Sequence, residues 1–421
     1  MVNPQKLKLE IQALGNRVGG ISRRSGSKTV FVRGALPGEI VLCAPEMEKK
    51  SYVEARLLEI LRPSPHRIEP SCVNYSWCGG CSLQHLEYSR QLHWKREWVR
   101  NAMRRRRVAG EAPSEVTASP AIIGYRNRVT FEVVDGRPGL HAFRGDPRPV
   151  ERCPLLPPQG NELLAALSRQ GLEGWKRVAI RSSTGTGSQR VELYGSGEAT
   201  QPKLADGVGV AWRVGERWNS AGPELRERLA GISLHVPPGG FLQVNTGAAE
   251  RMVALVTRLC GPGRVLDLYG GVGTFGLPLA ASGRRVLTVE RCDRSVRSGS
   301  EAAREQGLDG IRFLSRSARS YLVQAVRGGE SFDTVVADPP RSGLGTRVAR
   351  LLRRLLAHRI ILVGCDPFAM ARDLEVLLAG GYHLQKMHAL DLFPQTDHVE
   401  TVALLERDAP KQAASGRGKA D

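Results

Sequence analysis

A glycine-rich loop between a predicted strand and a predicted helix constrains the fold of this chain more than any other feature. The apolar run Val-Leu-Asp-Leu at 265–268 is typical of a buried strand, and Gly-Gly-Val-Gly-Thr-Phe-Gly follows at 270–276. Glycines at such a turn let the backbone approach a ligand closely. Glu290 follows a second predicted strand about 20 residues further on, where an acid that binds a ribose is expected. By itself the pattern fits a nicotinamide dinucleotide and S-adenosylmethionine equally well.

Strands and helices continue to alternate toward the C-terminus. Further strand-like runs lie at 333–337, 360–363 and 399–405, with helical stretches between them. This alternation predicts a doubly wound parallel sheet, so we expect an α/β Rossmann-like domain at 235–408. The tail at 409–421 contains mainly Ala, Gly, Lys and Ser and is predicted to be disordered.

The sequence Asp-Pro-Pro-Arg at 338–341 distinguishes the two ligands. It follows an apolar strand and therefore lies beside the crevice in which open α/β sheets bind ligands. Asp-Pro-Pro at this place resembles methyltransferases of amino groups and bases, whereas a nicotinamide dehydrogenase has no need of it. Adenine N6-methyltransferases usually carry an aromatic residue in the fourth position, so Arg341 argues against adenine. An S-adenosylmethionine-dependent methyltransferase is favoured, and an NAD-linked oxidoreductase is the alternative.

A cysteine and a glutamate near two other strand ends suit methylation of a pyrimidine carbon. Carbon 5 of uracil attacks a sulfonium methyl group only after a thiolate has added to carbon 6, and a base must then remove the carbon 5 proton. Cys365 follows the strand at 360–363 and precedes a predicted helix, whose dipole favours a thiolate. Glu400 opens the last strand, and His398 is the next candidate for the base. A structural cysteine and an ordinary strand-edge charge are the alternatives.

The N-terminal segment, 1–62, has the short strands and turns of a small β-barrel. Ala-Leu-Pro-Gly-Glu at 35–39 and a basic insert at 23–28 give it a resemblance to the TRAM domain, an OB-like RNA-binding barrel appended to RNA-modifying enzymes. We expect an α+β central domain at 63–234. Its stretch 171–222 is rich in Gly and polar residues and allows no assignment.

Cysteines cluster in the central segment. Cys72-x5-Cys78-x2-Cys81 is followed far downstream by Cys153. In a cytosolic chain, clustered cysteines bind a metal more often than they form disulfides. Four thiolates suit an iron–sulfur cluster, and a zinc site with four cysteine ligands fits about equally well.

The net charge indicates a polyanionic partner. The chain has 61 Lys and Arg against 42 Asp and Glu, a formal charge of +19. Neutralising phosphates releases counterions, which favours binding. No signal peptide is evident and no apolar stretch approaches the roughly 20 residues that span a membrane, so we expect a cytoplasmic protein that binds RNA and neither DNA nor a membrane. A helix-like stretch with Trp94, Lys95, Trp98 and a basic run at 104–107 fits RNA binding or a solvated basic helix equally well.

These motifs, with Phe-Leu-Gln-Val-Asn at 241–245 and Phe-Pro-x3-His-Val-Glu at 393–400, occur in the order of the RNA uracil-5-methyltransferase family, which the chain resembles over nearly its whole length. The 23S rRNA branch is the most similar, since the tRNA branch lacks the TRAM domain and the cysteine cluster. The resemblance implies that Cys365 is the nucleophile and Glu400 the proton acceptor. It also implies cofactor contacts from Gln243, Tyr269, Thr274, Glu290 and Asp338, and a [4Fe-4S] cluster on Cys72, Cys78, Cys81 and Cys153.

Two residues depart from the pattern of that family. Asp366 follows the nucleophile where Asn is usual, and Thr274 occupies a position that is often Asn. An acid beside Cys365 would oppose formation of the thiolate. The sequence therefore predicts S-adenosylmethionine-dependent methylation of a uridine, with 23S rRNA as the expected substrate. The alternatives are a tRNA uridine, the oxidoreductase, and a non-catalytic RNA-binding factor that kept the fold.

Overall fold

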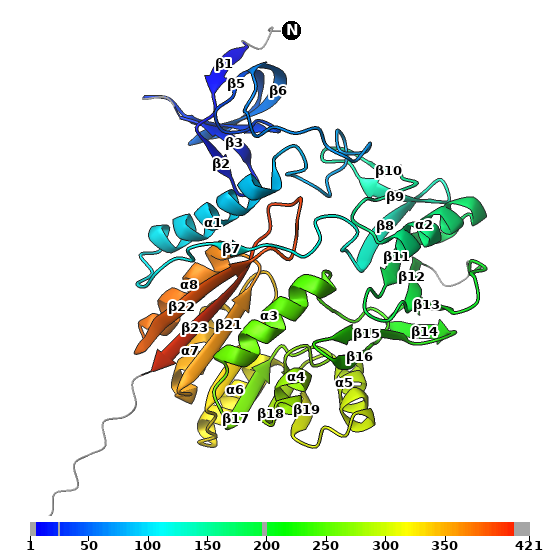
Figure 1. Cartoon of the computed structure of the whole chain (residues 1–421), viewed down its shortest axis with the longest axis vertical. Helices are drawn as coiled ribbons and strands as arrows, with labels where there is room; N and C mark the ends of the chain where they lie inside the picture. The colour runs from blue at the N-terminus through cyan, green and yellow to red at the C-terminus, as the bar shows by residue number, and fades with distance from the viewer. Residues whose placement is uncertain (1–5, 24–25, 196–199, 408–421) are drawn as a thin grey trace, which may run out of the picture.

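Three large β-sheets follow one another along the chain, and the last of them has helices on its two faces (Figure 1). The computed structural model describes residues 6–23, 26–195 and 200–407, so the predicted disordered tail at 409–421 lies outside the described residues. Within the described ranges, every helix is too short or too polar to span a lipid bilayer.

The N-terminal sheet has six strands in the order β1-β5-β6-β4-β3-β2. They are β1 (Leu7–Glu10), β2 (Ala13–Gly15), β3 (Gly19–Ser22), β4 (Thr29–Arg33), β5 (Ile40–Glu48) and β6 (Tyr52–Arg62). Alternate residues of β4 are buried, and Val30 and Val32 pack with Leu9 in the core of this sheet. The buried Glu39 carboxylate accepts hydrogen bonds from Arg67 at 2.6 and 2.9 Å. A β domain is therefore present at the N-terminus, and its assignment as a TRAM-like RNA-binding barrel stays a prediction.

The central sheet has seven strands in the order β10-β9-β8-β11-β12-β13-β14, and α2 (Pro158–Gln170) packs on it. Its strands are β8 (Arg128–Val134), β9 (Arg137–His141), β10 (Pro147–Pro149), β11 (Trp175–Ser182), β12 (Gln189–Gly195), β13 (Val208–Val214) and β14 (Arg217–Ala221). The described parts of the stretch 171–222 thus form strands despite their polar residues. One reason is that the buried Glu192 pairs with Arg181 at 2.8 Å and with Arg190 at 2.7 Å, which satisfies these charges inside the sheet.

The C-terminal sheet has eight strands in the order β19-β18-β17-β20-β21-β23-β22-β7. Its strands are β7 (Val116–Thr117), β17 (Arg264–Leu268), β18 (Arg285–Glu290), β19 (Ile311–Ser315), β20 (Thr334–Ala337), β21 (Arg359–Gly364), β22 (Tyr382–Leu390) and β23 (Glu400–Arg407). The hairpin of β15 (Leu225–Leu229) and β16 (Ile232–Val236) comes directly before α3 along the chain. The helices around the C-terminal sheet are α3 (Thr246–Leu259), α4 (Gly276–Ala281), α5 (Asp293–Glu305), α6 (Ala318–Arg327), α7 (Gly345–Leu355) and α8 (Pro367–Leu378).

The prediction of a parallel sheet is correct from β19 to β21 and wrong at the other end. β23 pairs antiparallel with both β21 and β22. The chain passes from β22 to β23 through a loop at 391–399 without a crossover helix, and strands joined in this way run antiparallel.

Residues 88–117 cross from the central segment to the C-terminal sheet. Here α1 (Tyr88–Arg105) packs against α8, and β7 pairs with β22. The boundary near residue 234 assigned both elements to the central domain, and the division of the chain into domains stays a prediction. In this arrangement α1 lies between the N-terminal sheet and the C-terminal sheet (Figure 1).

Candidate active site

The carboxyl ends of β17, β20 and β21 and the amino end of β23 meet at one edge of the C-terminal sheet. Asp338 follows β20, Cys365 follows β21, and Glu400 is the first residue of β23. Gly364 pairs with Thr401 in the antiparallel register, and the Thr401 hydroxyl donates to the Gly364 carbonyl at 2.7 Å. The register ends at this pair. Cys365 and Glu400 are the next residues of the two segments, and they are close enough for the charge of Glu400 to act on the Cys365 thiol. The fold thus brings both predicted catalytic residues together.

Glu400 is a buried acid with a second acid close by. The residue is 2% exposed, and burial together with the charge of Asp338 raises the pKa of Glu400 well above its usual range. Burial also raises the pKa of Asp338 to about 7, although the Gln243 amide donates to its carboxylate at 3.1 Å. A carboxylate with a raised pKa is a stronger base than an exposed one, which suits removal of a proton from carbon.

Cys365 is a neutral thiol in the free protein. Burial, followed by the charges of Glu400 and Asp338, raises the pKa of Cys365 to about 12, while Arg341 lowers it. The N-terminus of α8 therefore does not keep this cysteine ionised at rest, contrary to the expectation from the sequence, because burial and two acids outweigh the helix dipole.

Asp366 is engaged in two interactions that the sequence did not predict. Its Oδ1 caps α8 by accepting the backbone N–H groups of Phe368 and Ala369 at 2.9 and 3.0 Å. Its Oδ2 pairs with Arg17, from the turn between β2 and β3, at 2.6 Å. Burial raises the pKa of Asp366, but the two N–H donors and Arg17 lower it below its usual value. The negative charge beside Cys365 is thus compensated by the helix end and by an arginine.

The glycine loop has a backbone that few residues tolerate. Tyr269 and Gly271 have positive φ angles of 61° and 59°. A Cβ atom at Gly270 would lie 2.4 Å from an oxygen of Asp267, so the loop has no room for a side chain there. The Gly271 N–H donates to the Glu290 carboxylate at 3.2 Å, which connects the loop to the end of β18. Tyr269 and Glu290 therefore lie at the same edge as Asp338.

Two polar groups near this loop bear on ligand binding. Asp267 is fully buried, burial raises its pKa to about 7, and its Oδ1 has no hydrogen-bond partner in the described part of the chain. Thr274 is 7% exposed and lies within the loop. An unpartnered buried acceptor beside a close-fitting glycine turn suits a ligand that carries polar groups. The other residue predicted to bind the cofactor, Gln243, reaches this edge through its bond to Asp338.

A buried network holds the loop that precedes Glu400. The ammonium group of Lys95, on α1, donates to the Asp391 carboxylate at 2.6 Å and to the Phe393 carbonyl at 3.0 Å. Both charged side chains of this pair are 0% exposed. From the same helix, Gln91 donates to the Gln395 side chain at 2.9 Å.

The burial pattern of α1 differs from both expectations for this stretch, RNA binding and a solvated basic helix. Lys95 and Trp98 are buried. The buried residues of α1 recur at helical spacing, and Lys95 lies among Gln91, Trp98, Val99 and Ala102. A lysine on the apolar face of a helix needs a buried acid as partner, and Asp391 is that acid.

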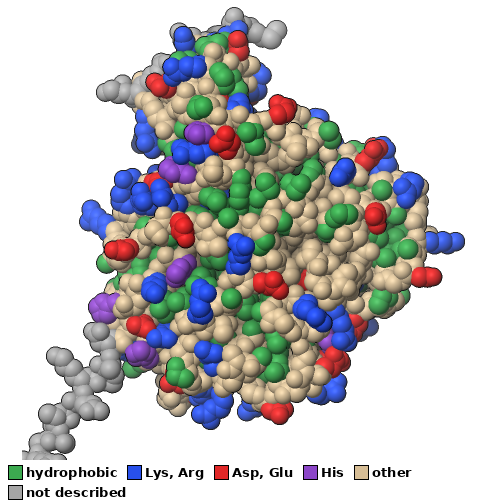
Figure 2. Space-filling model, viewed as in Figure 1, with side chains coloured by type: hydrophobic (Ala, Val, Ile, Leu, Met, Phe, Trp, Pro, Cys, Tyr) green, Lys and Arg blue, Asp and Glu red, His purple; other side chains and the backbone are tan. Residues whose placement is uncertain are grey.

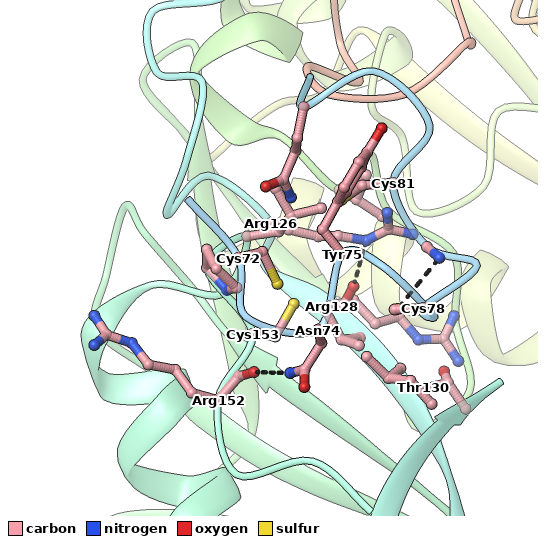
Figure 3. Close-up of a pocket in the computed structure, with 17 residues that line it drawn as sticks. Cys72, Asn74, Tyr75, Cys78, Cys81, Arg126, Arg128, Thr130, Arg152 and Cys153 are labelled. Carbon is pink, nitrogen blue, oxygen red and sulfur yellow. Dashed lines mark hydrogen bonds between the residues drawn. The ribbon is translucent and has the colours of Figure 1, made fainter. Parts of the chain in front are cut away.

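The four clustered cysteines line one cavity of about 410 Å³ (Figure 3). All four are free thiols, and Figure 3 shows the sulfur atoms of Cys72 and Cys153 pointing toward one another. Burial raises the pKa of Cys81 to about 12 and raises the pKa values of Cys78 and Cys153. Among the residues that the structure describes, no three His, Cys, Asp or Glu side chains are arranged to hold a metal ion.

Comparison with known proteins agrees with this geometry. Residues 228–408 match the family model described as tRNA (Uracil-5-)-methyltransferase. The chain is 33% identical to an uncharacterized RNA methyltransferase of Gloeobacter violaceus, over 97% of this chain and 98% of that protein. It is 34% identical to the 23S rRNA (uracil(1939)-C(5))-methyltransferase of Alkalilimnicola ehrlichii, over 96% of this chain and 97% of that protein.

One solved structure resembles almost the whole chain. It is the tRNA (uracil-54, C5)-methyltransferase of Pyrococcus abyssi in complex with S-adenosyl-L-homocysteine, with a TM-score of 0.78 and 27% identity over 95% of this chain and 100% of that one. The expectation that tRNA-modifying relatives lack the N-terminal segment is therefore wrong.

The choice between nicotinamide and S-adenosylmethionine, which the glycine loop left open, is now decided. The solved relative binds S-adenosyl-L-homocysteine with the same fold, and the sequence relatives cover nearly the full length of the chain. This protein belongs to the S-adenosylmethionine-dependent RNA uracil-5-methyltransferase family.

Proposed function

We propose that this protein methylates carbon 5 of a uridine in 23S rRNA, with Cys365 as nucleophile and Glu400 as proton acceptor. The observation that carries the proposal is the pairing of Gly364 with Thr401 at the end of β21 and β23, because the next residues on the two segments are the thiol of Cys365 and the buried acid Glu400. Asp338 is at the same edge, and its charge contributes to the raised pKa values of both Cys365 and Glu400.

The roles of the two residues follow from the chemistry of uracil. The Cys365 thiol loses its proton to solvent and its sulfur adds to carbon 6, which leaves an enolate with a nucleophilic carbon 5. S-adenosylmethionine, when bound, supplies the methyl group as a sulfonium electrophile. Glu400 then accepts the carbon 5 proton, the bond between sulfur and carbon 6 breaks, and its electron pair returns to Cys365. Arg341 offsets the two acids when Cys365 ionises.

The residues that would hold the methyl donor are those around the glycine loop. We assign this role to Gln243, Tyr269, Thr274, Glu290 and Asp338. The close backbone turn at Gly270 and the unpartnered buried oxygen of Asp267 support a polar ligand at this place.

The assignment to 23S rRNA is supported by relatives that are named for uridine 1939 of that RNA, among them proteins of Alkalilimnicola ehrlichii and Vibrio campbellii. A tRNA uridine is the second candidate, because the structural relative from Pyrococcus abyssi is named for tRNA. The test is to map C5-methyluridine in 23S rRNA and in tRNA from cells with and without the gene. Loss of the methyl group at the rRNA position equivalent to 1939 supports the proposal, and loss in tRNA alone replaces it with the second candidate.

We further propose that Cys72, Cys78, Cys81 and Cys153 hold a [4Fe-4S] cluster. The support is a cavity of about 410 Å³ lined by four free cysteines, because such clusters take four thiolate ligands. The cavity is lined by Cys72, Cys78 and Cys81 of the segment 63–87 and by residues of β8 and β9, so the group would stabilise this segment against the central sheet. A single zinc ion is the alternative, and iron and zinc analysis separates the two.

A further inference from the structure

A groove lies between the N-terminal sheet and α1 and reaches Phe368, in the first turn of α8. Its volume is about 380 Å³. Residues of the turn between β2 and β3, of β4, of α1 and of the first turn of α8 line it. Its charged and aromatic lining residues are Arg23, Phe31, Trp94, Trp98, Arg104, Arg105 and Phe368, and no Asp or Glu is among the lining residues.

Phe368 connects this groove to the catalytic edge. It lies three residues after Cys365, in the first turn of α8, and it is 39% exposed although it is a large apolar residue. The guanidinium of Arg105 lies over its ring, 5.8 Å from the centroid. The pair of Arg17 and Asp366, at 2.6 Å, connects the turn between β2 and β3 with the residue that directly follows Cys365, and residues of both segments line the groove.

The arginines that line the groove lack carboxylate partners among the described residues. Arg106, the C-cap residue of α1, pairs with Glu375 at 3.4 Å, whereas Arg104 bonds only to the Asn101 amide oxygen at 2.9 Å. In the part of the chain that the structure describes, neither Arg104 nor Arg105 has a carboxylate partner. Figure 2 shows Lys and Arg side chains gathered beneath the N-terminal sheet, over the end of α1. Unpaired guanidinium groups attract phosphate.

The lining therefore fits one class of ligand. An exposed aromatic ring with a guanidinium over it offers a stacking surface for a planar base, and neighbouring unpaired arginines suit the phosphates on either side. An apolar peptide would leave the arginines without partners, and a free anion would leave the aromatic faces unused. A single-stranded nucleotide uses both.

We propose that this groove holds an unpaired nucleotide of the substrate RNA that flanks the methylated uridine, with its base stacked on Phe368 and its phosphates on Arg104 and Arg105. The inference rests on the proposed function, since the target uridine would occupy the catalytic edge beside Cys365. The groove then determines which strand segment enters the active site together with the uridine.

The test is a coupling experiment on RNA affinity. The probe is a fluorescent RNA oligonucleotide that spans the equivalent of uridine 1939 of 23S rRNA, and a set of variants lacks the base at one flanking position each. Binding to the full-length protein is measured with S-adenosylhomocysteine, so that no methyl group is transferred. The protein variants are Phe368→Ala, Phe368→Tyr, Arg105→Ala and, as a matched control, Arg350→Ala, which removes another exposed helix arginine, on α7.

Phe368→Ala is expected to weaken binding of the intact RNA about tenfold, as for loss of one stacked base. One RNA, which lacks the base that stacks on Phe368, should bind Phe368→Ala and the parent protein with equal affinity. Phe368→Tyr should bind the intact RNA with the affinity of the parent. Arg105→Ala should reduce the salt dependence of binding by about one phosphate contact. Arg350→Ala should change neither the affinity nor its salt dependence. Equal melting temperatures exclude unfolding as the cause.

The proposal is overturned if Phe368→Ala binds the intact RNA with the affinity of the parent. It is also overturned if Phe368→Ala weakens binding by the same factor whichever flanking base is missing. Failure of the proposed function is seen separately, in the unmodified protein, as absence of methyl transfer to this RNA. In that case the same scan is carried out around the uridine that is methylated instead.

Discussion

The catalytic edge and the cysteine cavity are built in opposite ways. Cys365 directly follows β21 and Glu400 begins β23, two strands that pair in one sheet. The buried Lys95 holds the loop before Glu400. The cavity cysteines lie instead in turns and loops, outside every helix and every named strand that the structure describes.

This difference bears on what organises each site. Strand pairing fixes the positions of the catalytic groups once the sheet has formed, whereas on our proposal the loops around the cavity gain part of their order from the cluster that they would bind. We therefore expect changes at the catalytic edge to remove chemistry and spare the fold. Changes at the cavity should remove the bound group and lower stability.

The largest effect is expected for Cys365→Ala. Without a nucleophile, methyl transfer should fall at least about a thousandfold, while cofactor and RNA affinity stay near those of the parent. Single-turnover assays with radioactive cofactor measure this. Cys292→Ser is the control, because Cys292 also follows a strand and directly precedes a helix, α5. Near-normal turnover in Cys365→Ala would exclude the mechanism.

Glu400→Gln should separate the two catalytic roles. Thiolate addition and methyl transfer precede proton removal, so this variant should methylate once and then stall, because elimination requires loss of the carbon 5 proton. The product is a covalent adduct between protein and methylated RNA that survives denaturing electrophoresis. Cys365→Ala combined with Glu400→Gln should form no adduct. If Glu400→Gln releases methylated RNA at the parent rate, the base is another group, and His398 is the next candidate.

The proposed cluster in the cavity is tested by metal analysis. Protein purified without oxygen should be brown and contain about four irons per chain, as four thiolate ligands imply. Cys153→Ser should lose most of the iron and melt at a lower temperature, since cluster binding contributes to folding. Cys365→Ala should keep its iron, which shows that the two sites are independent. Stoichiometric zinc in a colourless, active protein would contradict the assignment.

A smaller effect, on stability alone, is expected at the loop before Glu400. Lys95→Met leaves Asp391 buried without its partner, and breaking a buried ion pair costs about 3–5 kcal/mol. Arg100→Ala is the control, because Arg100 pairs with Glu97 at 3.3 Å with its side chain 51% exposed, and such pairs contribute about 0–1 kcal/mol. Denaturant unfolding measures both. An equal decrease in the free energy of unfolding in the two variants would show that the buried pair is not what stabilises this loop.

The smallest effect concerns the pH dependence of thiol reactivity. The pKa of Cys365 is raised to about 12, so iodoacetamide should modify it slowly at pH 8 and faster as the pH approaches 12, because only the thiolate reacts. Glu400→Gln removes a nearby negative charge and should shift this profile to lower pH. Cys292, whose pKa is lowered by hydrogen bonds from Ser295 and Arg294 despite partial burial, should react first. A profile for Cys365 that does not move in Glu400→Gln would mean that the two groups do not interact.

Much of the catalytic edge could be predicted from local patterns. Apolar runs that end in Asp-Pro-Pro or Gly-Cys-Asp-Pro mark the carboxyl ends of β20 and β21, and parallel strands put such ends at one edge. Cys365 and Asp338 could therefore be placed from the sequence. Lys95 could not, because its place on the apolar face of α1 has meaning only when Asp391, 296 residues away, is known to lie opposite it.

By itself the sequence determined the chemical groups: a thiol after a strand, an acid at the start of the last strand, a glycine turn without side chains, and clustered cysteines. These depend on residue type and near neighbours. Only the tertiary structure decided which groups are partners. Cys365 and Glu400 are neighbours because β23 runs antiparallel to β21, and Asp366 is compensated because a turn of the N-terminal sheet reaches it with Arg17. Such pairings come from contacts between segments far apart along the chain, which local spacing does not encode.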